Sequence, residues 1–430
     1  MHLTNFRPAV REDMRGTRGE YGSRKLATRR AVRFHPSPPD KNNNNMYQLR
    51  DYQQQASDAA VSFFRSTEKG NAIEVLPTGA GKSLIIADIA ARLGAPVLIF
   101  QPSKEILEQN YMKLCSYGIM DCAIFSASFN RKQVARITFA TIGSAKGRKD
   151  LFRSFKYVIV DECHYVNAEQ GMYRDFFETN PSKVLGLTAT PYRLYSTRYG
   201  GSMLRFITRT RPNIFSKVIY VAQVNELLYQ GYLAKMEYYR CRIIDRSKLK
   251  VNSSGADYTD ASVKKHYKEV DFQGHLLDIV RRLLAVGRKS ILVFTRFIEE
   301  AEYLVRSLGS GAVISSKTEK ASRARTIKAF KAGEINVVAN VGVLTTGFDY
   351  PELATIVIAR PTMSLALYYQ MVGRGIRPYP GKVGWVVDLC DNYDRFGRVE
   401  DLHVGYTKPG LWAVFSGSRQ LTNVWFGSKM

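Results

Sequence analysis

From Tyr47 onward, short runs of β-branched and aromatic residues alternate with longer segments whose apolar residues recur at helical spacing. This alternation is typical of a parallel β-sheet that is covered by helices on both faces. Strands are expected at 72–76, 97–100, 137–140, 157–160 and 184–187 in the first half, and at 291–294, 312–314, 335–339, 354–358 and 385–389 in the second. Helices are expected at 82–93, 104–114, 298–308 and 321–332. The two halves therefore resemble two copies of one α/β architecture.

The chain of 430 residues is too long for one ordinary core and long enough for two domains. We expect a first domain at 46–220 and a second domain at 221–403, with a polar loop at 245–270. The regular alternation is interrupted after residue 191, where a basic and aromatic stretch occupies 192–218. Residues 404–430 form a tail without a clear period.

Residues 1–45 form an N-terminal arm with ten Lys or Arg, four acidic residues and few large apolar side chains. Such a segment cannot bury enough apolar surface to fold on its own, so we expect it to be disordered. The arm is either a solvated leader or a basic segment that holds a polyanion. A third possibility is that the working protein begins at Met46.

Lysine and arginine outnumber aspartate and glutamate by 63 to 38, which gives a formal charge of 63 − 38 = +25. A surplus of this size favours a polyanionic partner, usually nucleic acid and less often an anionic membrane surface. No run of about 18 apolar residues occurs, so no membrane span is expected. The five cysteines include no C-x-x-C pair, so neither a disulfide framework nor zinc is expected. Together with the lack of an apolar signal segment, this favours the cytoplasm.

The segment 76–83, LPTGAGKS, follows a predicted strand and opens a predicted helix. Gly79 and Gly81 allow a tight turn in which successive N–H groups, with that of Thr78, point at phosphate oxygens. Lys82 is then expected to bridge the β- and γ-phosphates of ATP, and the Ser83 hydroxyl to bind Mg²⁺. The sequence therefore predicts a phosphate site at the start of this helix.

Two carboxylates, Asp161 and Glu162, follow the buried strand at 157–160. Ligands of open α/β sheets bind at the carboxyl ends of such strands. We expect Asp161 to hold Mg²⁺ and Glu162 to orient and activate the attacking water. His164 is expected to make a polar contact between motifs.

These residues belong to a series of blocks that resembles the motifs of superfamily 2 helicases, in order, across 49–378. The blocks are LRDYQQQ at 49–55, PTGAGKS at 77–83, QPSKEILEQN at 101–110, FATIGSA at 139–145, DECH at 161–164, TAT at 188–190, VFTR at 293–296, NVGVLTTGFD at 340–349 and QMVGRGIR at 370–377. Several phrases are most similar to bacterial RadD-type DNA-repair helicases and related phage enzymes. Those proteins carry a cysteine-rich region after the helicase core, whereas only 52 residues with one cysteine follow Pro378 here (430 − 378). This resemblance places the protein in the bacterial cytoplasm or a phage-infected cell.

The resemblance implies two tandem RecA-like parallel-sheet domains with ATP and nucleic acid bound at the cleft between them. It makes Gln53 the adenine reader and Arg374 and Arg377 arginine fingers from the second domain. Gly347 and Asp349 are expected near the nucleotide. A role in coupling the two sites is assigned to His164, Thr188, Thr190 and Gln370.

Contacts with nucleic acid are expected from hydroxyls, amides and cations, which bind phosphates without reading sequence. The candidates are Gln101, Ser103, Lys104, Thr141, Thr295, Arg296, Thr345 and Thr346. Residues 130–156 hold eight Lys or Arg and are expected to surround Thr141. Residues 192–218 interleave six Lys or Arg with Tyr192, Tyr195, Tyr199, Phe206 and Phe215, and are either an ordinary surface loop or a nucleic-acid element. In the tail, Trp412 and Trp425 are expected to cap the second sheet, with a partner or DNA contact as the alternative.

The resemblance implies an ATP-dependent DNA helicase or branch-migrating translocase in DNA repair or recombination, acting on single-stranded, forked or branched DNA. The alternatives are a duplex translocase that never separates strands, an RNA helicase, and an ATP-switched clamp whose hydrolysis is incidental. The last is disfavoured, because a clamp has no need of both Glu162 and Arg377.

Overall fold

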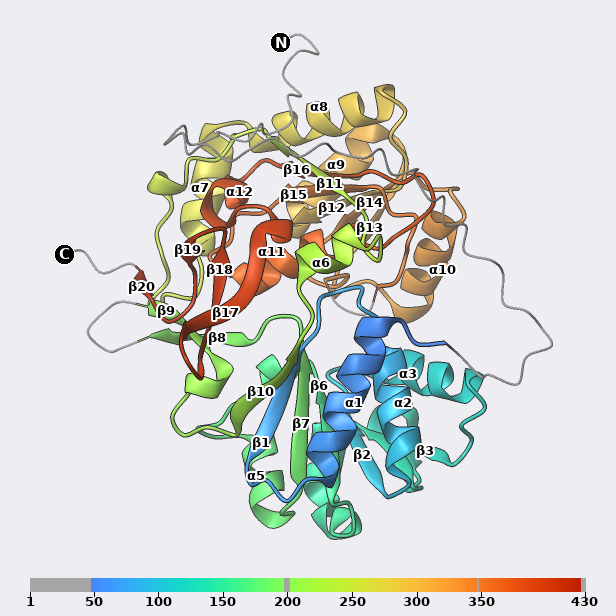
Figure 1. Ribbon diagram of the computed structural model, residues 1–430. Helices are drawn as coiled ribbons and strands as arrows, with labels where there is room; N and C mark the ends of the chain where they lie inside the picture. The colour runs from blue at the N-terminus through green and yellow to red at the C-terminus, as the bar shows by residue number, and fades with distance from the viewer. Residues whose placement is uncertain (1–47, 197–201, 346–347, 427–430) are drawn as a thin grey trace, which may run out of the picture.

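The computed structural model describes residues 48–196, 202–345 and 348–426 of the chain. It has two parallel β-sheets, one in the lower and one in the upper half of Figure 1, and both are flanked by helices. The predicted α/β class with two parallel-sheet units is therefore confirmed. We call the described residues up to Val221 the first lobe, and residues 236–401 the second lobe. The expectations for the arm at 1–45 and for Thr346 and Gly347 fall outside the described residues.

The first sheet has eight strands in the order β10-β1-β7-β6-β2-β5-β3-β4, all parallel except for the pair β3–β4. The strands are β1 Asn71–Val75, β2 Val97–Phe100, β3 Cys122–Ser126, β4 Arg131–Lys132, β5 Ile137–Ala140, β6 Tyr157–Asp161, β7 Lys183–Thr188 and β10 Phe215–Val221. The five predicted strands agree with the structure to within one residue at each end. Their nearly continuous burial explains the apolar runs that identified them.

The helices of the first lobe are α1 Asp51–Arg65, α2 Lys82–Leu93, α3 Lys104–Ser116, α4 Ile142–Ala145 and α5 Met172–Thr179. Helix α3 begins after Ser103, whose hydroxyl accepts a hydrogen bond from the backbone N–H of Ile106 at 3.3 Å. Helix α2 starts directly after the glycine-rich loop, as predicted.

The second sheet has six parallel strands in the order β11-β16-β15-β12-β14-β13. They are β11 Met236–Arg240, β12 Ile291–Thr295, β13 Ala312–Ile314, β14 Val337–Asn340, β15 Thr355–Ala359 and β16 Gly384–Asp388. The surrounding helices are α6 Val224–Tyr229, α7 Asp260–Glu269, α8 Phe272–Ala285, α9 Ile298–Leu308, α10 Lys320–Lys331, α11 Leu365–Val372 and α12 Asn392–Phe396. The predicted loop at 245–270 is partly wrong, because its second half is helix α7.

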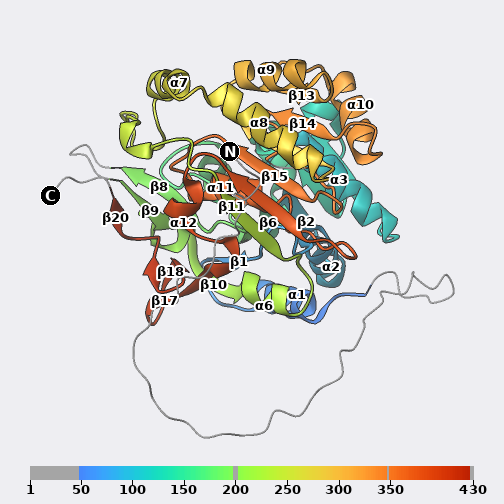
Figure 2. The same ribbon diagram turned by 90° about the horizontal axis from the view of Figure 1, so that it is seen from above.

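Two small sheets lie beside the lobes, at the left of Figure 2. One joins β8 Tyr192–Ser196 and β9 Ser202–Phe206 with the distant strand β20 Trp425–Phe426, and the other contains β17 Leu402–Lys408, β18 Leu411–Ser416 and β19 Arg419–Gln420. Among the described residues of 192–218, strands β8 and β9 form a hairpin, and a short irregular segment leads from it to the edge strand β10 of the first sheet. The expectation that Trp425 caps the second sheet is wrong, because its strand pairs with β9 of the first lobe.

The interior of the first sheet holds one unpaired acid, Glu74 of β1. Its side chain is fully buried, and neither carboxylate oxygen has a hydrogen-bond partner among the described residues. Burial raises the pKa of Glu74 well above its usual range. The folded protein therefore keeps a proton that the unfolded chain releases above about pH 4.5.

This difference makes the stability of the fold depend on pH. We expect Glu74→Gln to have a higher Tm than the wild type, and this difference in Tm to grow by roughly a few degrees between about pH 5 and about pH 8. The reason is that the unfolded wild-type chain releases the Glu74 proton as the pH rises, whereas the folded protein keeps it, so that unfolding of the wild type becomes more favourable. Thermal unfolding at both pH values checks this, with Glu108→Gln on the exposed face of α3 as the control. A margin that is constant across this interval would contradict the assignment.

Candidate active site

The loop between β1 and α2 has the local geometry of a phosphate site. Gly79 and Gly81 adopt φ values of 87° and 76°, in the left-handed region that favours glycine. A Cβ atom at Gly81 would lie 2.5 Å from Nε2 of Gln53, so a larger residue there would displace the Gln53 amide. Helix α2 begins at Lys82, and the partial positive charge of its N-terminus faces the same space.

A cavity of about 740 Å³ lies at this loop, between the two lobes. Its volume suits a nucleoside triphosphate. From the first lobe it is lined by Gln53, Thr78, Gly79, Gly81, Lys82, Ser83, Asn110, Asp161 and Glu162, and from the second lobe by Asp349, Arg374 and Arg377. The structure thus brings all described residues of the predicted nucleotide site to one cavity, although they come from segments up to 324 positions apart in the sequence (377 − 53).

Glu162 lies between two potential cations. Its carboxylate is 3.3 Å from Nζ of Lys82 and 3.4 Å from Nδ1 of His164. Burial works to raise the pKa of Glu162, but the charge of Lys82 and the hydrogen bond with His164 outweigh it, so the pKa is lowered. Glu162 is therefore ionised at neutral pH and able to accept a proton.

Ser83 and Asp161 offer hard oxygen ligands, the kind that Mg²⁺ prefers. Asn110 holds them together, because it accepts a hydrogen bond from the Ser83 hydroxyl at 2.5 Å and donates one to Asp161 at 3.4 Å. Burial and the neighbouring charge of Glu162 raise the pKa of Asp161. A divalent cation would reverse this shift. The residues present therefore fit a magnesium site.

Gln53 is fixed beside the phosphate loop. Its amide donates to the carbonyl of Ala80 at 3.0 Å and accepts from the backbone N–H of Arg50 at 3.0 Å. The hydroxyl of Tyr52 also donates to Ala80, at 2.9 Å. The start of α1 is thus tied to the loop at two points, and an adenine contact by Gln53 stays a prediction.

A chain of hydrogen bonds leads away from Glu162. Nδ1 of His164 and the hydroxyl of Thr188 are 2.9 Å apart, and that hydroxyl accepts from the backbone N–H of Thr190 at 3.0 Å. Strand β8 begins two residues later, at Tyr192. The three predicted coupling residues of the first lobe therefore link the cavity to the hairpin β8–β9.

The second lobe reaches the phosphate loop through α11 and the turn after it. Arg374 is buried, donates to the carbonyl of Phe348 at 2.9 Å, and has a pKa that burial lowers to about 10. Arg377 forms an ion pair with Asp349, and burial likewise lowers its pKa to about 10. Both guanidinium groups therefore stay charged at neutral pH. A Cβ atom at Gly79 would lie 3.6 Å from Cγ of Arg377, so the stem of this side chain lies against the loop.

Three residues at this junction were not singled out from the sequence. Asn110 bridges the two magnesium-type ligands, the Tyr369 hydroxyl bonds to the backbone of Thr78, and the Tyr165 hydroxyl bonds to Gln370. Each lies inside or beside a recognised block, namely 101–110, 161–164 and 370–377. The blocks located the region, but the partner of each side chain depends on the packing of the lobes.

The predicted nucleic-acid residues of the first lobe share a second cavity, of about 1080 Å³, which contains Gln101, Ser103, Lys104 and Thr141. The amide of Gln101 is buried, with no partner for either polar atom among the described residues. Lys104 donates to the carbonyl of Ser128 and lies 4.2 Å from the ring centroid of Phe129. The Thr141 hydroxyl lies 3.0 Å from that of Ser144. Nucleic-acid binding by these residues stays a prediction.

Two of the nucleic-acid contacts predicted for the second lobe, Thr295 and Arg296, are wrong. Thr295 is fully buried and its hydroxyl donates to the carbonyl of Phe297 at 3.2 Å. The Arg296 side chain is 9% exposed, and it pairs with Asp257 at 3.3 Å and Asp260 at 2.8 Å. Both groups are thus committed to internal contacts, and Arg296 anchors the polar loop to the sheet. Thr345 is half-buried, and Thr346 lies outside the described residues.

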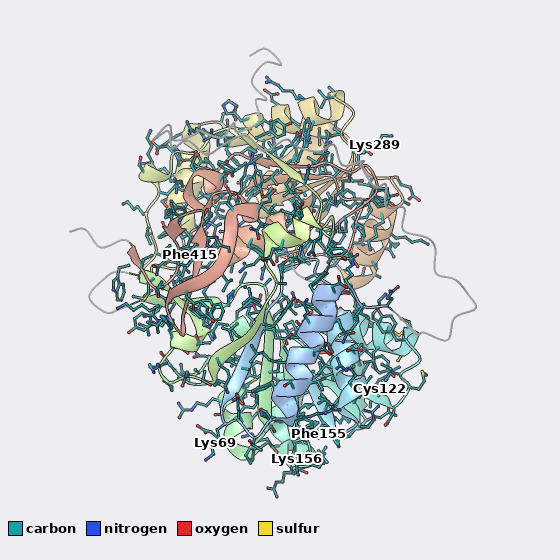
Figure 3. The ribbon with its side chains drawn as sticks, viewed as in Figure 1. Lys69, Cys122, Phe155, Lys156, Lys289 and Phe415 are labelled. Carbon is teal, nitrogen blue, oxygen red and sulfur yellow. The ribbon has the colours of Figure 1, made fainter. Side chains whose placement is uncertain are left out.

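The basic stretch 130–156 does not surround Thr141 as a whole. Thr141 follows β5, at the carboxyl end of the sheet, whereas Arg136 and Lys156 precede β5 and β6. Lys156 lies at the bottom of the first lobe, away from the second lobe (Figure 3). Of the aromatic residues in 192–218, Tyr192, Phe206 and Phe215 are buried in the core, so their rings are not placed to stack on bases. Tyr199 lies outside the described residues.

Comparison with known proteins gives two protein-family matches. Residues 46–193 match the family described as "Type III restriction enzyme, res subunit", and residues 275–378 match "Helicase conserved C-terminal domain". The chain is 26% identical over 336 residues to a "51.5 kDa protein" of Lactococcus phage (isolate 7-9), covering 76% of this chain and 67% of that protein. It is 27% identical over 344 residues to "DNA 3'-5' helicase XPB" of Mycobacterium tuberculosis, covering 77% of this chain and 58% of that protein.

Solved structures share the fold. A fragment of a putative HsdR subunit of a type I restriction enzyme from Vibrio vulnificus has a TM-score of 0.58 and 22% identity, covering 81% of this chain and 65% of that one. The type ISP restriction-modification enzyme LlaBIII bound to DNA has a TM-score of 0.57 and 18% identity, covering 80% of this chain and 28% of that one. The chain thus spans only part of the length of several of these proteins.

Proposed function

Because the chain belongs to the superfamily 2 helicases, we propose that it couples ATP hydrolysis with Mg²⁺ to movement along DNA, as a helicase or translocase. The observation that carries this proposal is the cavity between the lobes, which collects Lys82 and Glu162 from one side and Arg377 from the other. A site that is completed by two lobes makes hydrolysis depend on how closely they approach.

In the first lobe, the loop around Gly79 and Lys82 binds the triphosphate, and Lys82 contacts oxygens of its β- and γ-phosphates. When ATP binds, its phosphates take the place of Glu162 beside Lys82, which leaves the Glu162 carboxylate free to orient and deprotonate a water molecule. Ser83 and Asp161 would hold Mg²⁺, which would supply positive charge against the phosphate oxygens.

In the second lobe, Arg374 and Arg377 supply the cations that stabilise charge spreading over the γ-phosphate in the transition state. Asp349 holds Arg377 at the edge of the cavity until a phosphate of ATP replaces Asp349 as the partner of the Arg377 guanidinium group. The preference for ATP over other nucleotides is assigned to Gln53, which is anchored beside the loop.

Movement requires that hydrolysis change the grip on nucleic acid. The hydrogen bonds from Glu162 through His164 and Thr188 to Thr190 connect the cavity to the hairpin, and the bond between Tyr165 and Gln370 connects the lobes. We assign the grip of the first lobe to the cavity with Gln101 and Thr141. The charge of +25 favours a polyanion, and the relatives named as DNA helicases favour DNA. The role in DNA repair or recombination is part of the proposal and comes from the resemblance of the sequence motifs.

The experiment that tests this function is ATP hydrolysis measured with single-stranded DNA, duplex, fork, four-way junction and RNA. We expect DNA to raise the rate, and Lys82→Ala to abolish hydrolysis while DNA binding is retained, because Lys82 contacts phosphates of ATP and not of DNA. Lys69→Ala, an exposed lysine at the bottom of the first lobe in Figure 3, is the charge-matched control.

A rate of ATP hydrolysis that no nucleic acid changes would contradict the proposed coupling of hydrolysis to movement along DNA. Stimulation by RNA in preference to DNA would move the assignment to an RNA helicase. Displacement of a triplex strand without unwinding of a fork would identify a duplex translocase.

A further inference from the structure

The sheet β8–β9–β20 has one buried and one outward face. Side chains alternate along paired strands, and the partners Tyr192 and Phe206 point into the core. The opposite face carries Arg193, Tyr195, Arg205 and Trp425, and the neighbouring Arg211 lines the same cavity of about 270 Å³ as both other arginines. We call these five residues the arginine–aromatic face.

The arginines of this face have few counter-charges. Arg193 and Arg205 are direct cross-strand partners, an arrangement in which like charges are unfavourable. Among the described residues, no carboxylate lies within 4.0 Å of their guanidinium nitrogens or those of Arg211. Glu169 is the one acid among the described lining residues, and it acts electrostatically on Arg193. An anion on this face would therefore relieve a repulsion that the fold leaves in place.

Aromatic rings lie next to these cations. The Arg205 guanidinium is 3.4 Å from the ring centroid of Tyr195, and the rings of Tyr195 and Trp425 are 6.1 Å apart. Trp425 is 51% exposed although it lies in a strand. Exposed rings among arginines are how proteins hold single strands, since cations follow the backbone and unpaired bases stack on the rings.

The face also continues the cavity that contains Gln101 and Thr141. The loop after Tyr165 separates the two cavities, and Asn167 lines both. Arg193 holds this loop in place by donating to the carbonyl of Val166. A nucleic-acid strand that leaves the cavity with Gln101 and Thr141 across Asn167 arrives at the arginine–aromatic face.

We propose that the arginine–aromatic face binds an unpaired DNA strand as it leaves the first lobe. This inference rests on the proposed function, since it assigns a second contact for the same nucleic acid. Duplex DNA fits the face less well, because its bases are paired and cannot stack on Trp425.

The test measures binding of a fluorescent oligo(dT) to the full chain without nucleotide, by anisotropy at several salt concentrations. Arg205→Ala/Arg211→Ala is expected to weaken binding about tenfold and to lower the salt slope by about one to two, because two phosphate contacts are lost. The control Lys69→Ala/Lys156→Ala removes two exposed charges at the bottom of the first lobe in Figure 3 and is expected to bind as the wild type does.

A second measurement does not depend on the arginine variants being well folded. Oligo(dT) is expected to quench tryptophan emission of the wild type more than that of Trp425→Phe, since a base stacks on this ring. Affinity of the double variant within twofold of the wild type, together with equal quenching in Trp425→Phe, would overturn the proposal. Loss of duplex binding with unchanged oligo(dT) binding would overturn it as well. Failure of the proposed function is seen separately, as wild-type ATP hydrolysis that no nucleic acid stimulates.

Discussion

Replacing Arg377 with alanine is expected to lower the kcat of ATP hydrolysis by roughly 10³–10⁵-fold, the range for removal of an arginine finger. Its stem lies against Gly79 and its guanidinium group lines the nucleotide cavity, yet it belongs to the second lobe. Because its charge acts mainly on the transition state, binding of ATP to the first lobe should change far less than kcat. Single-turnover hydrolysis and equilibrium binding of a fluorescent ATP analogue separate the two effects.

Two variants control for this result. Arg325→Ala removes an exposed arginine from α10 of the same lobe and should leave kcat unchanged. Arg377→Lys keeps the charge but loses the planar fork, so it should recover only part of the rate. A loss of less than tenfold in Arg377→Ala would contradict the assignment of Arg377 as a group that stabilises the transition state.

Glu162→Gln is expected to reduce hydrolysis by roughly 10²–10⁴-fold, the usual contribution of a general base. The amide keeps the shape of the side chain but cannot accept the proton of the attacking water. ATP should bind at least as tightly as to the wild type, since the change removes a negative charge that competes for Lys82 at 3.3 Å. Nucleotide binding and phosphate release, measured on the same preparation, give both quantities.

The matched control is Glu178→Gln, an exposed acid on α5 with 59% side-chain exposure. It should leave hydrolysis and binding as they are. Equal activity of Glu162→Gln and the wild type would show that another group activates the water.

The sequence predicted the fold where local patterns determine it. Strands such as 97–100 are buried on both faces and therefore consist of uninterrupted apolar residues, and the phosphate loop needs glycines at fixed spacing. The edge strand β10 escaped prediction because it is half-buried and carries Lys217. The pairing of Trp425 with Met203 joins residues 222 positions apart (425 − 203), and no local pattern indicates it.

The residues of the candidate site likewise fall into two groups, those that belong to a local sequence motif and those that are brought together by tertiary packing alone. The residues of the nucleotide cavity belong to compact blocks, so they could be named before their geometry was known. Arg296 has the chemistry of a phosphate contact, but its ion pair with Asp257 bridges 39 positions and is set by tertiary packing alone. Asn110 was overlooked for the converse reason, because its role depends on lying between Ser83 and Asp161.

The most direct test of the central claim, that both lobes complete one nucleotide site, is the structure of the protein with ADP–aluminium fluoride, Mg²⁺ and single-stranded DNA. We expect the Arg377 guanidinium group within hydrogen-bond distance of the fluoride that stands for the γ-phosphate, and separated from Asp349. A complex in which only the first lobe contacts the nucleotide, with Arg377 still paired to Asp349, would contradict the account.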